Sequence, residues 1–240
     1  MIDLSFDGAI ATVSLNRPQA RNAMPIAAWD ALADTLPRLA EARVVILKSG
    51  VPGIFSAGAD VHEFETLRAD VALRSRFRLA MRRAIDGIAD LPMPVIAAVD
   101  GGCFGAAVAL TLAADVRVAG KDAAFAITPA RLGIGYPEAD VARLAAQVGR
   151  GVASLLLFTG DRISADEAKR IGLVDLASAK ADETAAAVAA TIAANAPGSV
   201  RLLKRTLRGE ATDPDFEAAY GGAEFLEGLT AFRERRRPAY

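Results

Sequence analysis

The sequence predicts an α/β fold, and two observations lead to that prediction. Strand-like and helix-like segments alternate over the first three quarters of the 240 residues, and the last third is helical. Two of the strand-like segments, "RVVILK" and "PVIAAVD", are apolar runs of the kind that form buried strands. At this length the chain can bury a large core, as one domain or as one domain with a helical extension.

The chain begins with a predicted β-hairpin, in which "IDLSF" and "AIATVSL" flank a tight turn at Asp7-Gly8. After the polar loop "NRPQARNAM", Pro25 suits the first turn of a helix. The apolar residues of that helix have helical spacing and comprise Ile26, Trp29, Leu32, Ala33 and Leu36. Pro37 is expected to kink or end the helix, and the strand "RVVILK" follows.

The middle of the chain is predicted to alternate loops, helices and strands. The loop "SGVPGIFSAGAD" leads into a short helix near Val61, and a long basic amphipathic helix follows from Arg68 to Asp90. Beyond the strand "PVIAAVD", a helix opens at Gly105, and "DVRVAG" forms a further strand. The segment "TPARLGIGYPEAD" is expected to be an irregular loop that precedes another helix.

The last third is predicted to be helical. In "SADEAKRIGLVD", Ser164 and Glu167 have the spacing of a capping box, and Gly172 suits the C′ position that ends the helix. Three more helices are expected over residues 181–195, 198–208 and 213–229, ahead of the basic tail "RERRRPAY". We therefore divide the chain into a core over residues 1–195 and a C-terminal helical region over residues 196–240.

Composition and charge exclude several classes of protein. The net charge of −1 argues against a nucleic-acid partner. The first residues lack the basic and apolar regions of a signal peptide, and the longest uncharged apolar stretch, residues 101–114, is too short to span a membrane. One cysteine, Cys103, allows no internal disulfide and indicates a reducing compartment, so we expect a cytoplasmic protein. One histidine and one cysteine leave little for a zinc site, and no metal is expected.

Two loops share a design that indicates a binding site. "FSAGAD" and "GCFGAA" each follow a strand, consist of small residues and enter a helix. A helix start exposes free backbone N–H groups, which can hold a negatively charged oxygen. The alternative for each loop alone is close packing of a strand on a helix. A dinucleotide site is disfavoured, because the turn lacks G-x-G-x-x-G.

The ordered set of segments is more specific than either loop. It runs "LNRPQARNAM", "FSAGAD", "PVIAAVDGGCFGAAVALTLAADVRVAG", "LLLFTGDRISADEAKRIGLVD" and "EGLTAFRERRRP". This set strongly resembles the crotonase superfamily of enoyl-CoA hydratases and isomerases, and it covers nearly the whole chain. The resemblance implies a core of ββα spiral turns and C-terminal helices that build trimers, often paired into hexamers. It also implies an acyl-CoA thioester as substrate, in fatty acid metabolism, with coenzyme A as part of the substrate and no separate cofactor.

The resemblance also implies a site. The backbone N–H groups of Ala59 and Ala106 would bind the thioester oxygen, as an oxyanion hole that stabilises an enolate. The second of these positions is usually glycine in the family; alanine keeps the N–H group and adds a methyl group. Further residues would contact the substrate, in part from a neighbouring subunit: Arg21, Ala57, Asp60, Phe232 and Arg235. The alternatives are a helix cap for Asp60 and a solvated loop or tail for the arginines.

The usual acid and base of the family are missing. Family hydratases carry two glutamates at positions that correspond here to Ala109 and Pro129, so ordinary hydration is in doubt. Family isomerases carry a single carboxylate at the position matching Pro137, and Glu138 lies one residue beyond it. Glu138 is therefore the candidate base. Alternatively, it is an acid in the first turn of the next helix, where its negative charge interacts favourably with the helix dipole. Asp140 is a second carboxylate of this segment.

His62 directly follows "AGAD" and could face the acyl pocket, or it could lie on the surface of a helix. We expect a cytoplasmic enzyme of the enoyl-CoA hydratase/isomerase family, a homotrimer or dimer of trimers, with isomerase-type or other single-carboxylate chemistry. The alternative is a non-catalytic acyl-CoA-binding homologue. The direction in which Glu138 points distinguishes the two: into the pocket for an enzyme, or into solvent for a binding protein.

Overall fold

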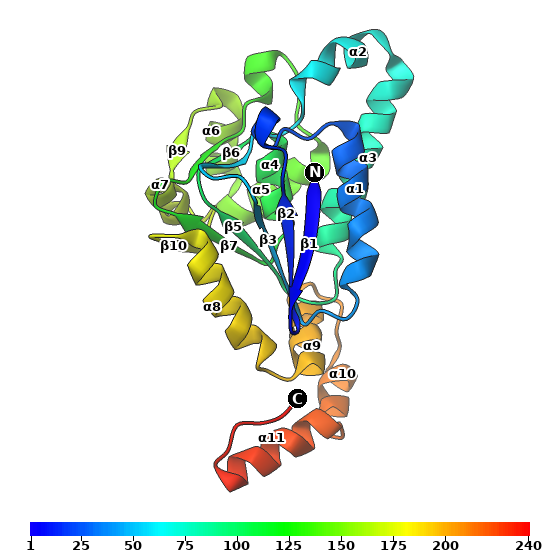
Figure 1. The fold of residues 1–240 in the computed structure, drawn as a ribbon, viewed down its shortest axis with the longest axis vertical. Coiled ribbons are helices and arrows are strands. Elements are labelled where there is room, and N and C mark those ends of the chain that lie inside the picture. Colours follow the sequence, from blue (N-terminus) through cyan, green and yellow to red (C-terminus); the bar gives the residue numbers. More distant parts are fainter.

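The computed structural model describes residues 1–240 and folds them into two β-sheets with helices around them (Figure 1). The larger sheet has six strands, in the spatial order β1 (Ile2–Asp7), β2 (Ile10–Leu15), β3 (Val44–Ser49), β5 (Val95–Val99), β7 (Val116–Gly120) and β10 (Leu176–Ser178). The smaller sheet has four, in the order β4 (Ile54–Ser56), β6 (Gly102–Phe104), β8 (Ala124–Ala126) and β9 (Ile163–Ser164).

The predicted hairpin is confirmed. Strands β1 and β2 pair antiparallel, with Asp7 opposite Ile10, so the two turn residues are Gly8 and Ala9 rather than Asp7 and Gly8. Gly8 has a φ of 55°, a conformation that glycine adopts without strain. The other ladders of the larger sheet are parallel.

Helices cover both faces of the larger sheet, which explains the unbroken apolar runs of its strands. On one face, Val45 and Leu47 of β3 share a core with α1 (Ile26–Thr35), α3 (Val71–Ala89) and α4 (Ala106–Leu112). On the other face, Val44 and Ile46 pack with Ala185 and its neighbours on α8 (Ala181–Ala193). Successive residues of a strand point to opposite faces, so both faces need apolar side chains.

The remaining helices are mostly short. They are the 3-10 turns η1 (Pro18–Ala20), η2 (Leu36–Leu39), η3 (Val61–Glu63) and η4 (Pro129–Leu132), and the helices α2 (Phe64–Ala69), α5 (Glu138–Val148), α6 (Arg150–Thr159), α7 (Ala165–Arg170), α9 (Pro197–Leu207), α10 (Asp213–Ala219) and α11 (Ala223–Glu234). As predicted, the helix that follows Pro25 ends just before Pro37, which lies in η2. Gly172 has a φ of 78° just beyond the end of α7, as its predicted role requires.

Four segments differ from the prediction. The single helix expected after the irregular loop is two helices, α5 and α6, divided at Gly149, which has a φ of 78°. The long helix expected from Arg68 begins at Val71, because the Asp70 carboxylate accepts hydrogen bonds from the Ala72 and Leu73 amides and starts a new helix. The helix expected from Asp213 is two helices, α10 and α11. Only half of the predicted capping box forms: the Ser164 hydroxyl accepts from the Glu167 amide, while the Glu167 carboxylate pairs with Arg170.

The last three helices extend away from the sheets (Figure 1). Helix α9 is attached through buried Lys204, whose Nζ donates to the Met93 carbonyl at 2.8 Å and to the Asp115 carboxylate at 2.6 Å. Several large apolar side chains of this region are exposed, among them Leu207, Leu226 and Phe232. No single helix is long and apolar enough to cross a membrane; α8 and α9 pass that test only as a pair, bent by 110° between them.

Candidate functional site

The site lies where strands of the smaller sheet end. Strands β4, β6 and β8 run parallel, so their carboxyl ends meet at one edge. The loop after β4 carries Ala57 to Asp60, the loop after β6 carries Gly105, and the segment after β8 leads to Pro129. These three-residue strands were not predicted, but they bring together the two small-residue loops that the sequence indicates.

The first loop is held by buried Asn22 and Ser56. The Asn22 amide group donates to the Phe55 carbonyl at 3.0 Å, and the Ser56 hydroxyl donates to the Asn22 carbonyl at 2.6 Å. The same hydroxyl accepts from the Gly58 amide at 3.0 Å. Asn22 has a φ of 55°, a left-handed conformation that asparagine tolerates better than most residues. These bonds fix the backbone of residues 56–58.

The second loop lies directly against the first. A Cβ atom on Gly58 would lie 2.4 Å from the Phe104 carbonyl oxygen and 3.1 Å from the Ala106 nitrogen. Gly58 also has a φ of 89°, so both its conformation and its surroundings require glycine. The Gly105 amide donates to the Ala126 carbonyl at 2.8 Å, which joins the second loop to β8.

The amides of Ala59 and Ala106 are left without partners. Neither N–H group donates a hydrogen bond within the protein, although their neighbours do: the Asp60 amide donates to the Met24 carbonyl at 3.0 Å. Ala106 is the first residue of α4, where helical amides have no partner in the helix. Both alanines line the same pocket. Two free donors from different loops therefore border one cavity.

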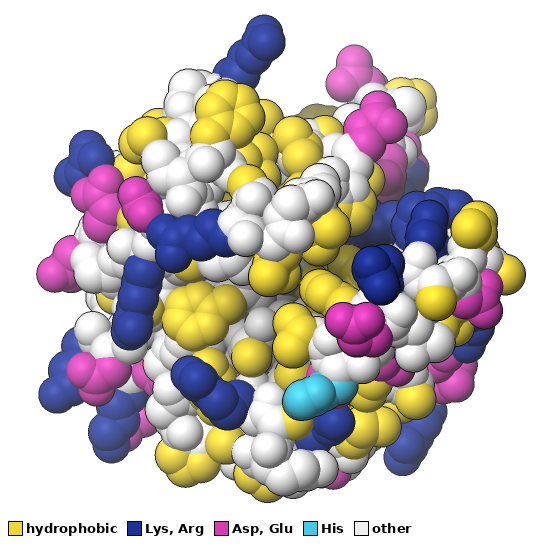
Figure 2. Space-filling view, turned by 90° about the horizontal axis from the view of Figure 1, so that it is seen from above, with side chains coloured by type: hydrophobic (Ala, Val, Ile, Leu, Met, Phe, Trp, Pro, Cys, Tyr) yellow, Lys and Arg dark blue, Asp and Glu magenta, His cyan; other side chains and the backbone are white.

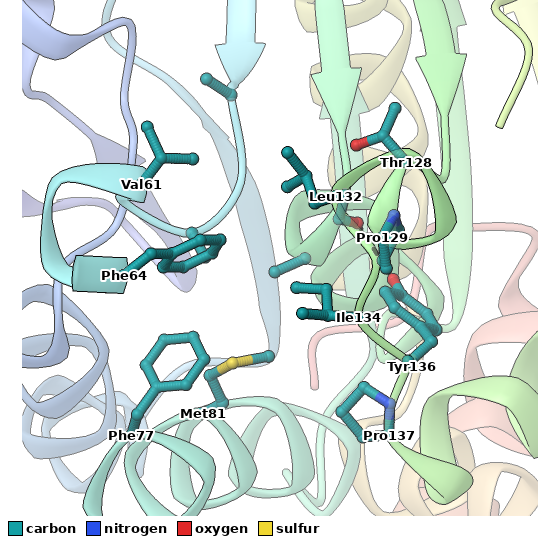
Figure 3. A pocket seen from close by; sticks show the side chains of 15 residues that line it. Val61, Phe64, Phe77, Met81, Thr128, Pro129, Leu132, Ile134, Tyr136 and Pro137 are labelled. Carbon is teal, nitrogen blue, oxygen red and sulfur yellow. Dashed lines mark hydrogen bonds between the residues drawn. The ribbon is translucent and has the colours of Figure 1, made fainter. Parts of the chain in front are cut away.

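That cavity is a largely apolar pocket of about 180 Å³, in which ten of fifteen lining residues are hydrophobic. One wall comes from η3, α2 and α3 and includes Phe64, Phe77 and Met81; the other comes from the segment 128–137 and includes Ile134 and Tyr136 (Figure 3). No carboxylate, histidine, lysine or arginine lines it. On the end of the molecule shown in Figure 2, apolar side chains gather in a hollow with arginine and lysine side chains around it.

The residues expected to contact the substrate in this subunit lie near the first loop. Ala57 lines the pocket, and its amide donates to the carbonyl of Arg21 at 3.0 Å, so exposed Arg21 lies beside the pocket edge. Asp60 is buried and does not line the pocket: it accepts from the His62 amide, as the predicted cap does, and pairs with Arg17 at 2.6 Å. Burial raises the pKa of Asp60, but the bonds from Arg17 and the His62 amide outweigh burial and lower it overall.

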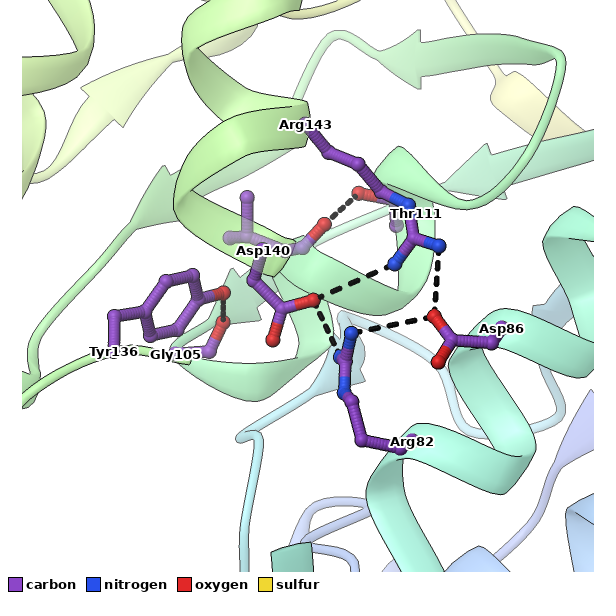
Figure 4. Close-up of polar contacts among 8 residues, drawn as sticks. Arg82, Asp86, Gly105, Thr111, Tyr136, Asp140 and Arg143 are labelled. Carbon is purple, nitrogen blue, oxygen red and sulfur yellow. Dashed lines mark hydrogen bonds and ion pairs between the residues drawn. The ribbon is translucent and has the colours of Figure 1, made fainter. Parts of the chain in front are cut away.

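The carboxylates of the segment after Pro137 lie outside the pocket lining. Glu138 is exposed and is the first residue of α5, the position of a first-turn acid. It lies toward solvent and not in the pocket lining, so its direction alone favours a binding protein over an enzyme. Asp140 is buried and paired with Arg82 and Arg143, and its second oxygen has no partner (Figure 4). Burial raises the pKa of Asp140 overall, although the positive charges of Arg82 and Arg143 act in the opposite direction. Ala109 is fully buried, and Pro129 lines the pocket.

Other residues singled out in the sequence lie apart from the pocket lining. His62 is exposed, on η3. Phe232 lies in the last turn of α11 and Arg235 directly follows this helix, and both are exposed. Helix α11 lies at the opposite end of the molecule from α2, which contributes Phe64 to the pocket (Figure 1). No group of three or more histidine, cysteine, aspartate or glutamate side chains is arranged to hold a metal ion.

Comparison with known proteins assigns the family. A family model described as "Enoyl-CoA hydratase/isomerase" matches residues 5–240. The chain belongs to the enoyl-CoA hydratase/isomerase family. The predicted crotonase resemblance is thereby confirmed, and the chain is an enzyme of this family. It is 36% identical to human "Enoyl-CoA hydratase domain-containing protein 2, mitochondrial", over 98% of this chain and 86% of that protein. It is 32% identical to "Short-chain-enoyl-CoA hydratase" of Clostridium acetobutylicum, over 98% of this chain and 95% of that one.

The fold agrees with solved structures of the enoyl-CoA hydratase/isomerase family. A crystal structure of a family member from Hyphomonas neptunium matches with a TM-score of 0.95 and 37% identity, over 100% of this chain and 97% of that chain. The predicted α/β fold of the crotonase type, with its helical C-terminal region, is therefore confirmed.

Sequence reasoning missed three residues that shape this site of the enoyl-CoA hydratase/isomerase fold: Asn22, Ser56 and Tyr136. Asn22 and Ser56 stand inside the motifs "QARNAM" and "FSAGAD". A polar residue among small residues is the sequence feature that could have identified each of them. Tyr136 stands in "LGIGYPEAD", beside the two carboxylates that the motif offers as candidate bases. Its hydroxyl donates to the Gly105 carbonyl at 3.0 Å (Figure 4).

Proposed function

We propose that the protein binds an acyl-CoA and stabilises the enolate of its thioester with the N–H groups of Ala59 and Ala106. The observation that carries this proposal is that two amides without partners belong to residues that line one apolar pocket. Removing a proton next to a thioester puts negative charge on the carbonyl oxygen. Two preorganised donors stabilise that charge, and losing one of them typically costs about 10²–10³-fold in rate.

The lining of the pocket supports an apolar acyl group. A carboxylate or ammonium group on the acyl chain would be buried against Phe64, Phe77 and Met81 with no opposite charge, which costs several kcal/mol or more. We therefore propose a hydrocarbon enoyl-CoA as substrate. Arg21, whose carbonyl accepts from the amide of the lining residue Ala57, would contact the coenzyme A portion. Phe232 and Arg235 would reach it only from a neighbouring subunit.

We further propose isomerase-type chemistry, in which one group moves a proton between two carbons. Ala109 and Pro129 supply no acid or base at the positions of the hydratase glutamates. Of the two carboxylates that follow Pro137, Glu138 makes no ion pair, whereas Asp140 is held by two arginines. Glu138 would have to turn from solvent toward the bound acyl group to act. Glu138 is therefore the proposed base.

The test compares binding with turnover. A saturated acyl-CoA should bind in calorimetry, and the thioether analogue, which lacks the carbonyl oxygen, should bind more weakly. Turnover is measured on 3-enoyl-CoA isomers and on 2-enoyl-CoA hydration, and isomerisation should be the faster reaction. Glu138→Gln should leave the Kd within a few-fold and lower isomerisation about 10²-fold.

Two outcomes would overturn parts of this account. Hydration at a rate typical of hydratases would contradict the isomerase-type proposal. Isomerisation that persists in Glu138→Gln and fails in Asp140→Asn, with acyl-CoA binding retained, would assign the base to Asp140.

A further inference from the structure

Tyr136 is the one ionisable side chain among the residues that line the pocket. Its hydroxyl donates to the carbonyl oxygen of Gly105 at 3.0 Å (Figure 4). The same oxygen also accepts from the Val108 amide at 3.0 Å. The Gly105 carbonyl therefore receives a hydrogen bond from outside its own helix.

The bonded carbonyl and the Ala106 N–H group belong to one peptide group. Electrons are delocalised over that group, so a donor on its oxygen makes the nitrogen more positive and its N–H a stronger donor. Gly105 has a φ of 53° and a ψ of −123°, a conformation with little steric restraint for glycine. The Tyr136 hydroxyl thus adds to the Val108 amide in restraining this peptide group.

We propose that Tyr136 is a positioning residue, whose hydroxyl orients and polarises the Gly105–Ala106 peptide group so that the Ala106 N–H binds the thioester oxygen more strongly. This inference rests on the proposed function, because it requires that the Ala106 amide meets that oxygen.

Two features of the surroundings suit this role. Burial, followed by the negative charge of Asp140, raises the pKa of Tyr136 well above its usual value, so the hydroxyl keeps its proton and remains a donor. The backbone amides of Gly135 and Tyr136 donate no hydrogen bond, so the tyrosine hydroxyl is the polar link between this pocket wall and the loop after β6.

The test is vibrational spectroscopy of a saturated acyl-CoA with a ¹³C-labelled thioester carbonyl, bound to the full-length protein. In the wild type the carbonyl stretch should shift to lower frequency than in water. In Tyr136→Phe, which removes only the hydroxyl, part of that shift should be lost, and kcat should fall roughly two- to eightfold while KM changes less. The matched control is Tyr220→Phe, an exposed tyrosine between α10 and α11, which should give the wild-type stretch.

A fluorinated tyrosine at position 136 gives a second, graded test, since a more acidic phenol is a stronger donor and should increase the shift. The same stretch in wild type, Tyr136→Phe and the fluorinated protein would overturn the positioning role and leave the proposed function intact. A wild-type stretch equal to that in water, with acyl-CoA bound, would instead overturn the proposed function itself. Thermal unfolding of each variant checks that the fold is unchanged.

Discussion

Gly58 sets how closely the two loops of the site approach each other. The space that a side chain would need is taken by the Phe104 carbonyl and the Ala106 nitrogen. The close contact therefore comes from backbone atoms, which cannot move without shifting the free amides of Ala59 and Ala106.

We expect Gly58→Ala to lower turnover about 10²-fold, because displacing one donor has an effect similar to removing it. Steady-state kinetics on the accepted enoyl-CoA measures this change. The control is Gly8→Ala, which has the same kind of left-handed strain, with a φ of 55°, but has nothing within 4 Å of the added methyl group. Equal turnover in Gly58→Ala and Gly8→Ala would contradict the proposed geometry.

Ionisation of Asp60, beside the first loop of the site, makes the free energy of unfolding depend on pH. Its folded pKa is lowered below the usual 3.8, so the carboxylate stabilises the fold fully above about pH 4, and this contribution is lost as the pH falls through the folded pKa. Asp60→Asn should therefore destabilise the protein at pH 7 and flatten the acid side of the stability curve. Urea unfolding between pH 3 and pH 8 measures both effects. An unchanged curve would show that the Arg17 pair contributes nothing.

The site residues that could be predicted from the sequence are those proposed to contribute a backbone N–H group. Ala59 and Ala106 follow from motifs of small residues, each contiguous in the chain. Asn22 and Tyr136 could not be assigned roles, because each acts on a partner about thirty residues away: 33 from Asn22 to Phe55 and 31 from Tyr136 to Gly105. Only the folded chain brings such pairs together.

At the scale of secondary-structure elements, the long strands and helices were predictable and the short ones were not. The strands β3 and β5 are apolar on both faces, so their composition alone identifies them. Strands β4, β6 and β8 have three residues each, too few for a period to show. Helix breaks at Asp70 and at residues 220–222 depend on caps and turns that periodicity does not register.

Lys204 decides how firmly α9 is attached to the sheet. We expect Lys204→Met to lower the free energy of unfolding by about 2–3 kcal/mol, because a buried charged hydrogen bond is lost and the Met93 carbonyl is left without its donor. Hydrogen exchange of α9 should accelerate. In the control Lys180→Met, which removes an exposed lysine paired with Glu183, little should change. Unchanged exchange in Lys204→Met would show that packing alone holds α9.

At the scale of the whole molecule, the C-terminal region exposes more large apolar side chains than a monomer is expected to expose. Leu207 is 90% exposed and Phe232 is 83% exposed. Contiguous apolar side chains at a surface mark sites of protein association. The predicted trimer, or dimer of trimers, would cover them and would bring Phe232 and Arg235 of one subunit toward the pocket of another.

We expect a trimer or hexamer at micromolar concentration in sedimentation, and a smaller species for Leu207→Glu. Leu79→Glu is the matched control, because Leu79 is also an exposed helical leucine, at 54%, but lies on α3 in the core region. A wild-type monomer would contradict the assembly. It would also leave Phe232 and Arg235 without access to a substrate.

The most direct test of the account is a crystal structure of the protein with a saturated, non-reactive acyl-CoA. We expect the thioester oxygen to lie about 2.7–3.1 Å from both the Ala59 and the Ala106 nitrogen atoms. The acyl chain should then lie between the wall of Phe64 and Met81 and the wall of Tyr136. A bound acyl-CoA whose thioester oxygen lies beyond hydrogen-bond distance of both amides would contradict it.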